Sequence, residues 1–246
     1  MSRLGTALAA HGRGLSLLVH PELRGLVLAP VGLMLLVYGA LTATALGALW
    51  PYLDRLGSAL PDALSGLTWL LQALAVLILL ALVGVLSLLL SQTLAAPFYG
   101  ALARRTERLL TGRLVSTERG LLGDLGATFG REWEKLRWTL PRLLLMFAVT
   151  LIPGLGLLAS PLTLLVAAWL LAGQFLDFTQ ENRGQPFATT LGLMRSQRMS
   201  ALAFGLPLAV GVTLPVLGAL VGAQAAIAGT IWVLTLKDAH PNRGAP

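Results

Sequence analysis

The sequence predicts an all-α membrane protein with two long transmembrane helices, two partly inserted (re-entrant) helical hairpins and cytoplasmic amphipathic helices. The first observation is composition: 12% of the 246 residues are charged, 56% are hydrophobic, and the mean hydropathy is +0.77. These values exclude an ordinary soluble domain and a disordered chain. The second observation is a set of four tracts without charge, at Gly25–Trp50, Ala63–Ala103, Leu143–Leu176 and Met199–Leu236. We expect residues 1–246 to form one integral membrane domain.

The first two tracts predict the two membrane-crossing helices, at about residues 25–50 and 64–96. A spanning helix needs roughly 20 apolar residues at about 1.5 Å each, and both tracts exceed that length. Residues 1–20 read as a short amphipathic lead-in, and Pro21 suits the first turn of the helix that follows. Trp50 and Trp69 flank the short loop between the spans, where aromatic side chains anchor a helix at the membrane interface. We expect Pro97 and Gly100 to interrupt the second helix.

Residues 97–142 form the largest polar segment and predict an amphipathic helix. Its apolar residues recur at steps of 4, 4, 3 and 4, which places them on one helical face: Leu125, Phe129, Trp133, Leu136 and Leu140. We expect this helix to lie along the cytoplasmic face of the membrane. Pro141 then begins the first hairpin.

The last two tracts predict hairpins at about residues 141–176 and 199–236. In the first hairpin the apolar limbs Leu143–Ile152 and Ser160–Leu176 have only 10 and 17 residues, so neither is a comfortable span. Pro153-Gly154-Leu155-Gly156 separates these limbs, and Pro207 and Pro215 break the second hairpin. Interrupted backbone is tolerated at membrane depth only where protein buries it or water reaches it. Paired broken segments therefore point to a binding site or a conducting path.

The basic residues predict the topology. If the first two tracts cross once and the last two return as hairpins, 17 of the 18 Lys and Arg lie on one side of the membrane. If each hairpin tract crossed once instead, Arg183, Arg195 and Arg198 would move to the other side. The positive-inside rule favours the hairpins and places both termini in the cytoplasm.

Several kinds of chemistry are missing from the sequence. There is no cysteine and no Gly-Lys-Ser/Thr loop, and His11, His20 and His240 have no spacing typical of a metal site or a catalytic dyad. We therefore expect neither an enzyme nor a resident cofactor or metal. The net charge of +7 fits membrane topology and contact with anionic lipid better than nucleic-acid binding.

Seven stretches in chain order resemble the CysZ family of bacterial inner-membrane sulfate permeases. They are His20-Pro21-Glu22-Leu23-Arg24, Ala95-Ala96-Pro97-Phe98-Tyr99-Gly100-Ala101-Leu102-Ala103, Arg131-Glu132-Trp133-Glu134-Lys135, Leu140-Pro141-Arg142, Ile152-Pro153-Gly154-Leu155-Gly156, Phe204-Gly205 and Ala226-Ile227-Ala228-Gly229-Thr230. The resemblance implies two transmembrane helices with two partly inserted hairpins, a homo-oligomer, and sulfate uptake for cysteine biosynthesis.

The resemblance also implies an anion site at Leu23, Arg24 and Gly25. The family tends to carry Gly-x-Arg-Arg here, whereas this chain has Glu22-Leu23-Arg24-Gly25, with one arginine fewer and an added carboxylate. Arg24 stands before an uncharged span, where a helix N-terminus and a guanidinium could hold a sulfate oxygen together. Alternatively, Arg24 contacts lipid phosphate.

The first hairpin break offers a second candidate anion site, at Pro153, Gly154 and Gly156. Proline frees backbone groups and glycine lets the chain approach a ligand closely. Alternatively, the break is a plain hairpin turn.

Charged residues of the polar segment predict a gate or ion-pair network at the cytoplasmic mouth. These residues are Arg104, Glu107, Arg108, Arg131 and Glu132. Alternatively, they form a solvated face that touches lipid headgroups. Asp177 follows an apolar limb, and we expect it to pair with Arg183 or Arg142.

Two functions follow from these patterns. The first is a sulfate or related oxyanion permease or channel that does not hydrolyse ATP. The second is a membrane scaffold without transport, whose basic belt holds anionic lipid or a partner protein. Sulfate flux into liposomes separates the two, because a scaffold carries none.

Overall fold

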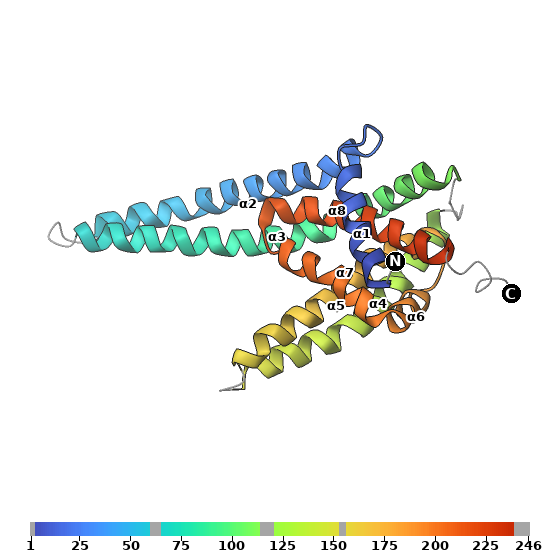
Figure 1. The fold of residues 1–246 in the computed structure, drawn as a ribbon. Helices are drawn as coiled ribbons and strands as arrows, with labels where there is room; N and C mark the ends of the chain where they lie inside the picture. The colour runs from blue at the N-terminus through green and yellow to red at the C-terminus, as the bar shows by residue number, and fades with distance from the viewer. Residues whose placement is uncertain (1–2, 60–64, 114–120, 153–155, 239–246) are drawn as a thin grey trace. The chain divides into compact units, whose positions relative to one another are not determined.

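The fold is given by a computed structural model, which describes residues 3–59, 65–113, 121–152 and 156–238 (Figure 1). The described residues form eight α-helices, which are α1 (Arg3–Leu17), α2 (Arg24–Ala59), α3 (Ser65–Thr111), α4 (Leu121–Thr150), α5 (Gly156–Asn182), α6 (Phe187–Ser196), α7 (Arg198–Gly211) and α8 (Pro215–Asp238). The described part of the chain is thus helical, as predicted.

Among the described residues, four helices are long and apolar enough to cross a membrane. The candidate spans are Arg24–Arg55, Leu67–Ser87, Ala159–Asn182 and Leu217–Asp238. They confirm a multi-pass membrane protein. Helix α7 is apolar but only 14 residues long, which is shorter than a full span. The re-entrant course of the two hairpins stays a prediction.

Two of the expected interruptions are wrong. Helix α3 continues through Pro97 and Gly100 to Thr111, and α7 continues through Pro207 to Gly211. Helix α4 also continues through Pro141 to Thr150. A proline inside a helix removes one backbone hydrogen bond, and a long apolar helix can tolerate that loss because its neighbours satisfy the freed groups. As a result, the charged residues that follow Pro97 lie on the same helix as the second span.

The chain divides into two compact units, one made of Met1–Leu28 with Pro97–Pro246 and the other of Ala29–Ala96. In the second unit α2 and α3 run antiparallel, and the side-chain amide of Gln72 donates a hydrogen bond of 2.9 Å to the carbonyl of Leu53. The candidate functional residues lie in the first unit.

Helices α5, α7 and α8 form the centre of the first unit, and α1 packs on α7 and α8. The rings of Phe204 and Trp232 stack at 5.4 Å inside this centre. Glycines allow the helices to approach closely. A Cβ added at Gly205 would lie 1.9 Å from the carbonyl oxygen of Ala168, and one at Gly229 would lie 2.9 Å from that of Phe175. Helix α5 is therefore in backbone contact with both α7 and α8.

Helix α4 contains the segment predicted to be amphipathic, and the described side chains of its two faces have unexpected neighbours. Trp133, Leu136 and Leu140 of the apolar face are exposed. Arg131 and Lys135, from the charged face, point instead toward α5. In a soluble protein a helix buries its apolar face and exposes its charged face. Helix α4 does the opposite, which suits a lipid environment.

Candidate functional site

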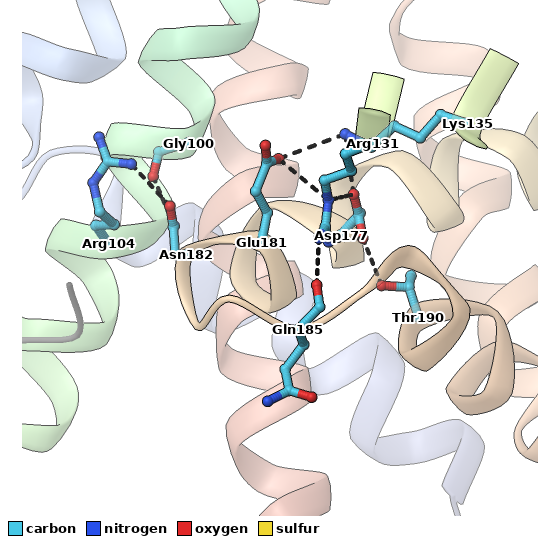
Figure 2. A network of polar contacts seen from close by, with 9 residues as sticks. All are labelled: Gly100, Arg104, Arg131, Lys135, Asp177, Glu181, Asn182, Gln185 and Thr190. Carbon is cyan, nitrogen blue, oxygen red and sulfur yellow. Dashed lines mark hydrogen bonds and ion pairs between the residues drawn. The ribbon is translucent and has the colours of Figure 1, made fainter. Parts of the chain in front are cut away.

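The C-terminal end of α5 holds a buried carboxylate at the centre of a polar network (Figure 2). The side chain of Asp177 is 0% exposed. Nε and Nη2 of Arg131 donate to its two oxygens at 3.0 and 2.5 Å, and Nζ of Lys135 lies 3.0 Å from Oδ2. The hydroxyl of Thr190 on α6 donates to Oδ1 at 2.7 Å. One carboxylate thus connects α4, α5 and α6.

The spacing of the charges explains how this network forms. Arg131 and Lys135 are four residues apart on α4, and Asp177 and Glu181 are four apart on α5, so each pair lies on one helical face. Lys135 also lies 3.5 Å from Glu181, and Arg131 donates to the carbonyl of Gln185. Two positive and two negative charges cancel here. Because both cations are paired with carboxylates, this network holds α4, α5 and α6 together.

A second buried ion pair joins α3 to the end of α5. Nε and Nη2 of Arg183 donate to one oxygen of Glu107 at 2.9 and 2.5 Å, and Glu107 is only 3% exposed. The other oxygen of Glu107 and Nη1 of Arg183 are buried without a hydrogen-bond partner in the described structure. This pair therefore keeps one acceptor and one donor available to a further polar group.

Three of the predicted gate residues contact the end of α5 or the residue after it, rather than one another. They are Arg104, Glu107 and Arg131. Nη1 of Arg104 donates to the side chain of Asn182 at 2.9 Å, and Asn182 donates to the carbonyl of Gly100 at 3.0 Å (Figure 2). Arg108 is exposed. The side chain of Glu132 lies outside the part of the chain that the structure describes.

The expected pairing of Asp177 with Arg183 or Arg142 is wrong. Asp177 pairs with Arg131 and Lys135, and Arg183 pairs with Glu107. Arg142 donates to the carbonyl of Trp138, and its guanidinium lies over the Trp138 ring at 4.5 Å. Sequence reasoning named Asp177 and Arg183 but missed their partners, because helix packing and not sequence spacing brings these residues together.

The predicted anion site lies at the start of α2. Leu23 is fully buried, Arg24 is the first residue of the helix and exposed, and a Cβ added at Gly25 would meet nothing within 4 Å. The amides of Leu23 and Arg24 both donate to the carbonyl of His20, at 2.9 and 3.0 Å. An anion here would therefore be held by the Arg24 guanidinium and the amides that follow.

The added carboxylate of Glu22 is paired with a neighbouring arginine. Its Oε2 lies 3.7 Å from Nε of Arg105 on α3, and both side chains are about half exposed. Arg105 offsets the negative charge of Glu22 near the start of α2. An exposed pair of this kind contributes little to stability, about 1 kcal/mol or less.

The second candidate anion site lies only partly within the described residues. Pro153 and Gly154 lie outside the described residues, and Gly156 is the first residue of α5. The break does fall between the end of α4 at Thr150 and this start.

A histidine contact that sequence reasoning missed attaches α1 to the helical centre. Nε2 of His11 donates to the carbonyl of Phe204 at 2.9 Å, and the side-chain amide of Gln224 donates to Nδ1 at 2.9 Å. The imidazole also stacks on the Phe204 ring at 4.6 Å. Burial lowers the pKa of His11 below 6.5, against the opposing effects of the contacts with Phe204 and Gln224. The neutral imidazole is the form that fits this contact.

The described residues contain no group of three or more His, Cys, Asp or Glu side chains arranged to hold a metal ion.

Comparisons with known proteins agree on one family. The family model described as "Sulfate transporter CysZ/Etoposide-induced protein 2.4" matches residues 10–222. A protein of Pseudomonas aeruginosa named "Sulfate transporter CysZ" is 34% identical over 227 residues, which cover 90% of this chain and 92% of the relative. A protein of the same name from Salmonella typhimurium is 32% identical over 233 residues, which cover 93% and 92%.

Proposed function

Because this chain belongs to the family of sulfate transporter CysZ and etoposide-induced protein 2.4, we propose that it carries sulfate into the cell across a bacterial inner membrane. The observation that carries the proposal is the match to named sulfate transporters over 90% of the chain. Four candidate membrane helices and the absence of an ATP-binding loop from the sequence support transport without ATP hydrolysis. The imported sulfate would feed cysteine biosynthesis.

Sulfate first binds at the start of α2. Arg24 supplies a guanidinium, and the amides after it supply the positive end of a helix, while Leu23 is buried and fixes the turn beneath them. Gly25 adds no side chain that would block the approach. We also propose Pro153, Gly154 and Gly156 as the next binding group for sulfate, a weak uncharged site that a dianion can also leave.

The charged residues around the end of α5 act as the gate. Arg104, Glu107 and Arg131 each contact this end, and Arg108 is exposed beside them on α3. Glu132 completes the predicted set. The Glu107–Arg183 pair supports this role because it keeps a donor on Arg183 and an acceptor on Glu107. A passing oxyanion can accept from the guanidinium while the pair rearranges.

The energetics limit how the transport is driven. Moving a dianion inward against a membrane potential costs about 4.6 kcal/mol per 100 mV, from ~2.3 per charge. Uptake therefore needs rapid consumption of sulfate inside the cell or coupling to a second ion.

The arrangement in the membrane is part of the proposal. The two spans cross once, the hairpins α4–α5 and α7–α8 enter and return on the cytoplasmic side, and both termini lie in the cytoplasm. The short α7, with 14 residues, supports a hairpin that does not cross. The chain assembles with copies of itself, which mass measurement of the purified protein in detergent would test.

The function is tested by uptake of isotopic sulfate into liposomes that contain the purified protein. We expect uptake above that of empty liposomes, and a loss of about tenfold in Arg24→Ala if one charged contact worth about 1.4 kcal/mol is removed. Arg198→Ala is the matched control, because Arg198 is also an exposed arginine at the first residue of a helix. If the intact protein takes up no sulfate, the scaffold function is favoured. If all variants take up sulfate equally, the anion site does not lie at the start of α2.

A further inference from the structure

A cavity lies between α2 and α3, wholly within the unit Ala29–Ala96 and apart from the residues proposed to handle sulfate. Its volume is about 480 Å³, within the range of roughly 300–1,000 Å³ that small-molecule sites occupy. Trp50, Leu53 and Asp54 line it from α2, and Trp69, Gln72 and Leu80 are among the residues that line it from α3.

The polar groups of this cavity suit a positively charged ligand. Asp54 is an exposed carboxylate, and no other acidic residue occurs among the described residues of this unit. The amide nitrogen of Gln72 donates to the carbonyl of Leu53 at 2.9 Å, so the amide oxygen remains as an acceptor. Trp50 and Trp69 add indole rings, whose faces attract cations. A carboxylate, an amide oxygen and two indoles together recognise an ammonium group.

The depth of the cavity indicates that the ammonium belongs to a lipid. Trp50 lies near the end of the candidate span Arg24–Arg55, and Trp69 lies near the start of Leu67–Ser87, where indoles mark the headgroup level of a membrane. Leu80 is 11 residues beyond Trp69, or roughly 16 Å along the helix, at the level of the acyl chains. The cavity therefore has a polar end at the headgroups and an apolar end among the chains.

We propose that this cavity binds a phosphatidylethanolamine-type lipid, with the headgroup ammonium at Asp54 and Gln72 and one acyl chain along α3 toward Leu80. The site depends only on the membrane location of α2 and α3, so a failure of sulfate uptake would leave it unaffected.

Native mass spectrometry of the full chain in detergent tests the site, with phosphatidylethanolamine and phosphatidylglycerol supplied at equal concentration. We expect phosphatidylethanolamine to be retained, and Asp54→Asn to weaken its binding roughly threefold to fivefold, the size of one partly exposed charge contact. Asp54→Glu keeps the carboxylate and should retain the preference. Arg55→Gln is the matched control, since Arg55 is the next residue but its guanidinium lies over the ring of Tyr52, outside the cavity.

Three outcomes would overturn the proposal. Equal retention of the two lipids would show ordinary lipid contact without recognition of the ammonium. Unchanged binding of phosphatidylethanolamine in a folded Asp54→Asn variant would show that the carboxylate is not part of the site. Protein that retains no lipid, and in which cysteines placed at Trp69 crosslink two chains, would show that a second copy covers the cavity.

Competition with soluble phosphoethanolamine tests the contact with the acyl chain. If ethanolamine lipids displace the bound lipid and the soluble amine does not, the acyl-chain contact is supported. If the soluble amine binds as tightly as the lipid, this contact is contradicted.

Discussion

Asp177 is the residue on which the packing of α4, α5 and α6 depends most directly. Its buried carboxylate accepts from Arg131 and Thr190 and pairs with Lys135. When one partner of a buried ion pair is removed, the remaining charges stay buried without compensation, and the cost exceeds the net contribution of the intact pair.

We predict that Asp177→Asn lowers the free energy of unfolding in detergent micelles by about 3 kcal/mol or more, because Arg131 and Lys135 lose their shared carboxylate. Glu22→Gln is the control, since it removes a half-exposed pair with Arg105 and should cost about 1 kcal/mol or less. Equal stability of the two variants would show that the Asp177 network does not hold the helices together.

His11 gives a second prediction at this scale, on pH. Since burial holds its pKa below 6.5 in the folded protein, the unfolded chain binds a proton more readily. Stability from this residue is therefore complete above pH 6.5 and is lost as the pH falls toward the lower folded pKa. In His11→Gln the loss between these pH values should shrink, as measured by thermal unfolding over a pH series.

His20 provides the control for the pH series, because it lies in the turn before α2 rather than between α7 and α8. His20→Gln should keep the loss of stability seen in the unaltered protein. If His11→Gln and the unaltered protein follow the same curve, the buried imidazole does not control the effect.

Sequence reasoning named the residues of these charged contacts but paired them wrongly. It placed Glu107 and Arg131 in a gate and expected Asp177 to pair with Arg183 or Arg142, whereas Asp177 pairs with Arg131 and Arg183 pairs with Glu107. Glu107 and Arg183 are 76 residues apart, and Arg131 and Asp177 are 46 apart. Such pairs depend on how helices pack, and side-chain periodicity within one helix carries no information about that.

At the scale of elements, the position of each proline within its helix decides its effect. Pro215 is the first residue of α8, a position that suits proline because the amide there has no partner within the helix. In the sequence, Pro153-Gly154 falls between α4 and α5. Pro97 and Pro141 lie inside α3 and α4, which continue past them. Composition identifies both kinds of proline equally, so the sequence did not show that Pro97 and Pro207 lie inside continuous helices.

The close contact of α5 with α7 gives the prediction at this scale. A Cβ at residue 205 would lie 1.9 Å from a backbone oxygen of Ala168, which cannot move aside without separating the helices. We expect Gly205→Ala to lower the free energy of unfolding by about 3 kcal/mol. Gly192→Ala is the matched control: Gly192 is also helical, a Cβ there meets nothing within 4 Å, and alanine should add roughly 0.5–1 kcal/mol. Similar stability of the two variants would contradict the backbone contact.

At the scale of the whole molecule, hydropathy and charge were enough to predict the class. The part of the chain that the structure describes holds four candidate spans, and family membership agrees with the resemblance drawn from seven short stretches. The course of the hairpins through the membrane is the feature on which the proposed anion path rests. If α4–α5 and α7–α8 return to the side from which they came, almost all basic residues share one side and the broken backbone lines a path between them.

Cysteine labelling measures this topology most directly, since the chain has no cysteine of its own. Thr189→Cys, between the hairpins, Arg113→Cys, after α3, and Tyr52→Cys, at the far end of α2, all place a thiol at an exposed position. With an impermeant reagent on intact cells, Tyr52→Cys should react, whereas Thr189→Cys and Arg113→Cys should react only after the membrane is opened. Reaction of Thr189→Cys from outside, together with Tyr52→Cys, would show that a hairpin crosses the membrane and would contradict the proposed arrangement.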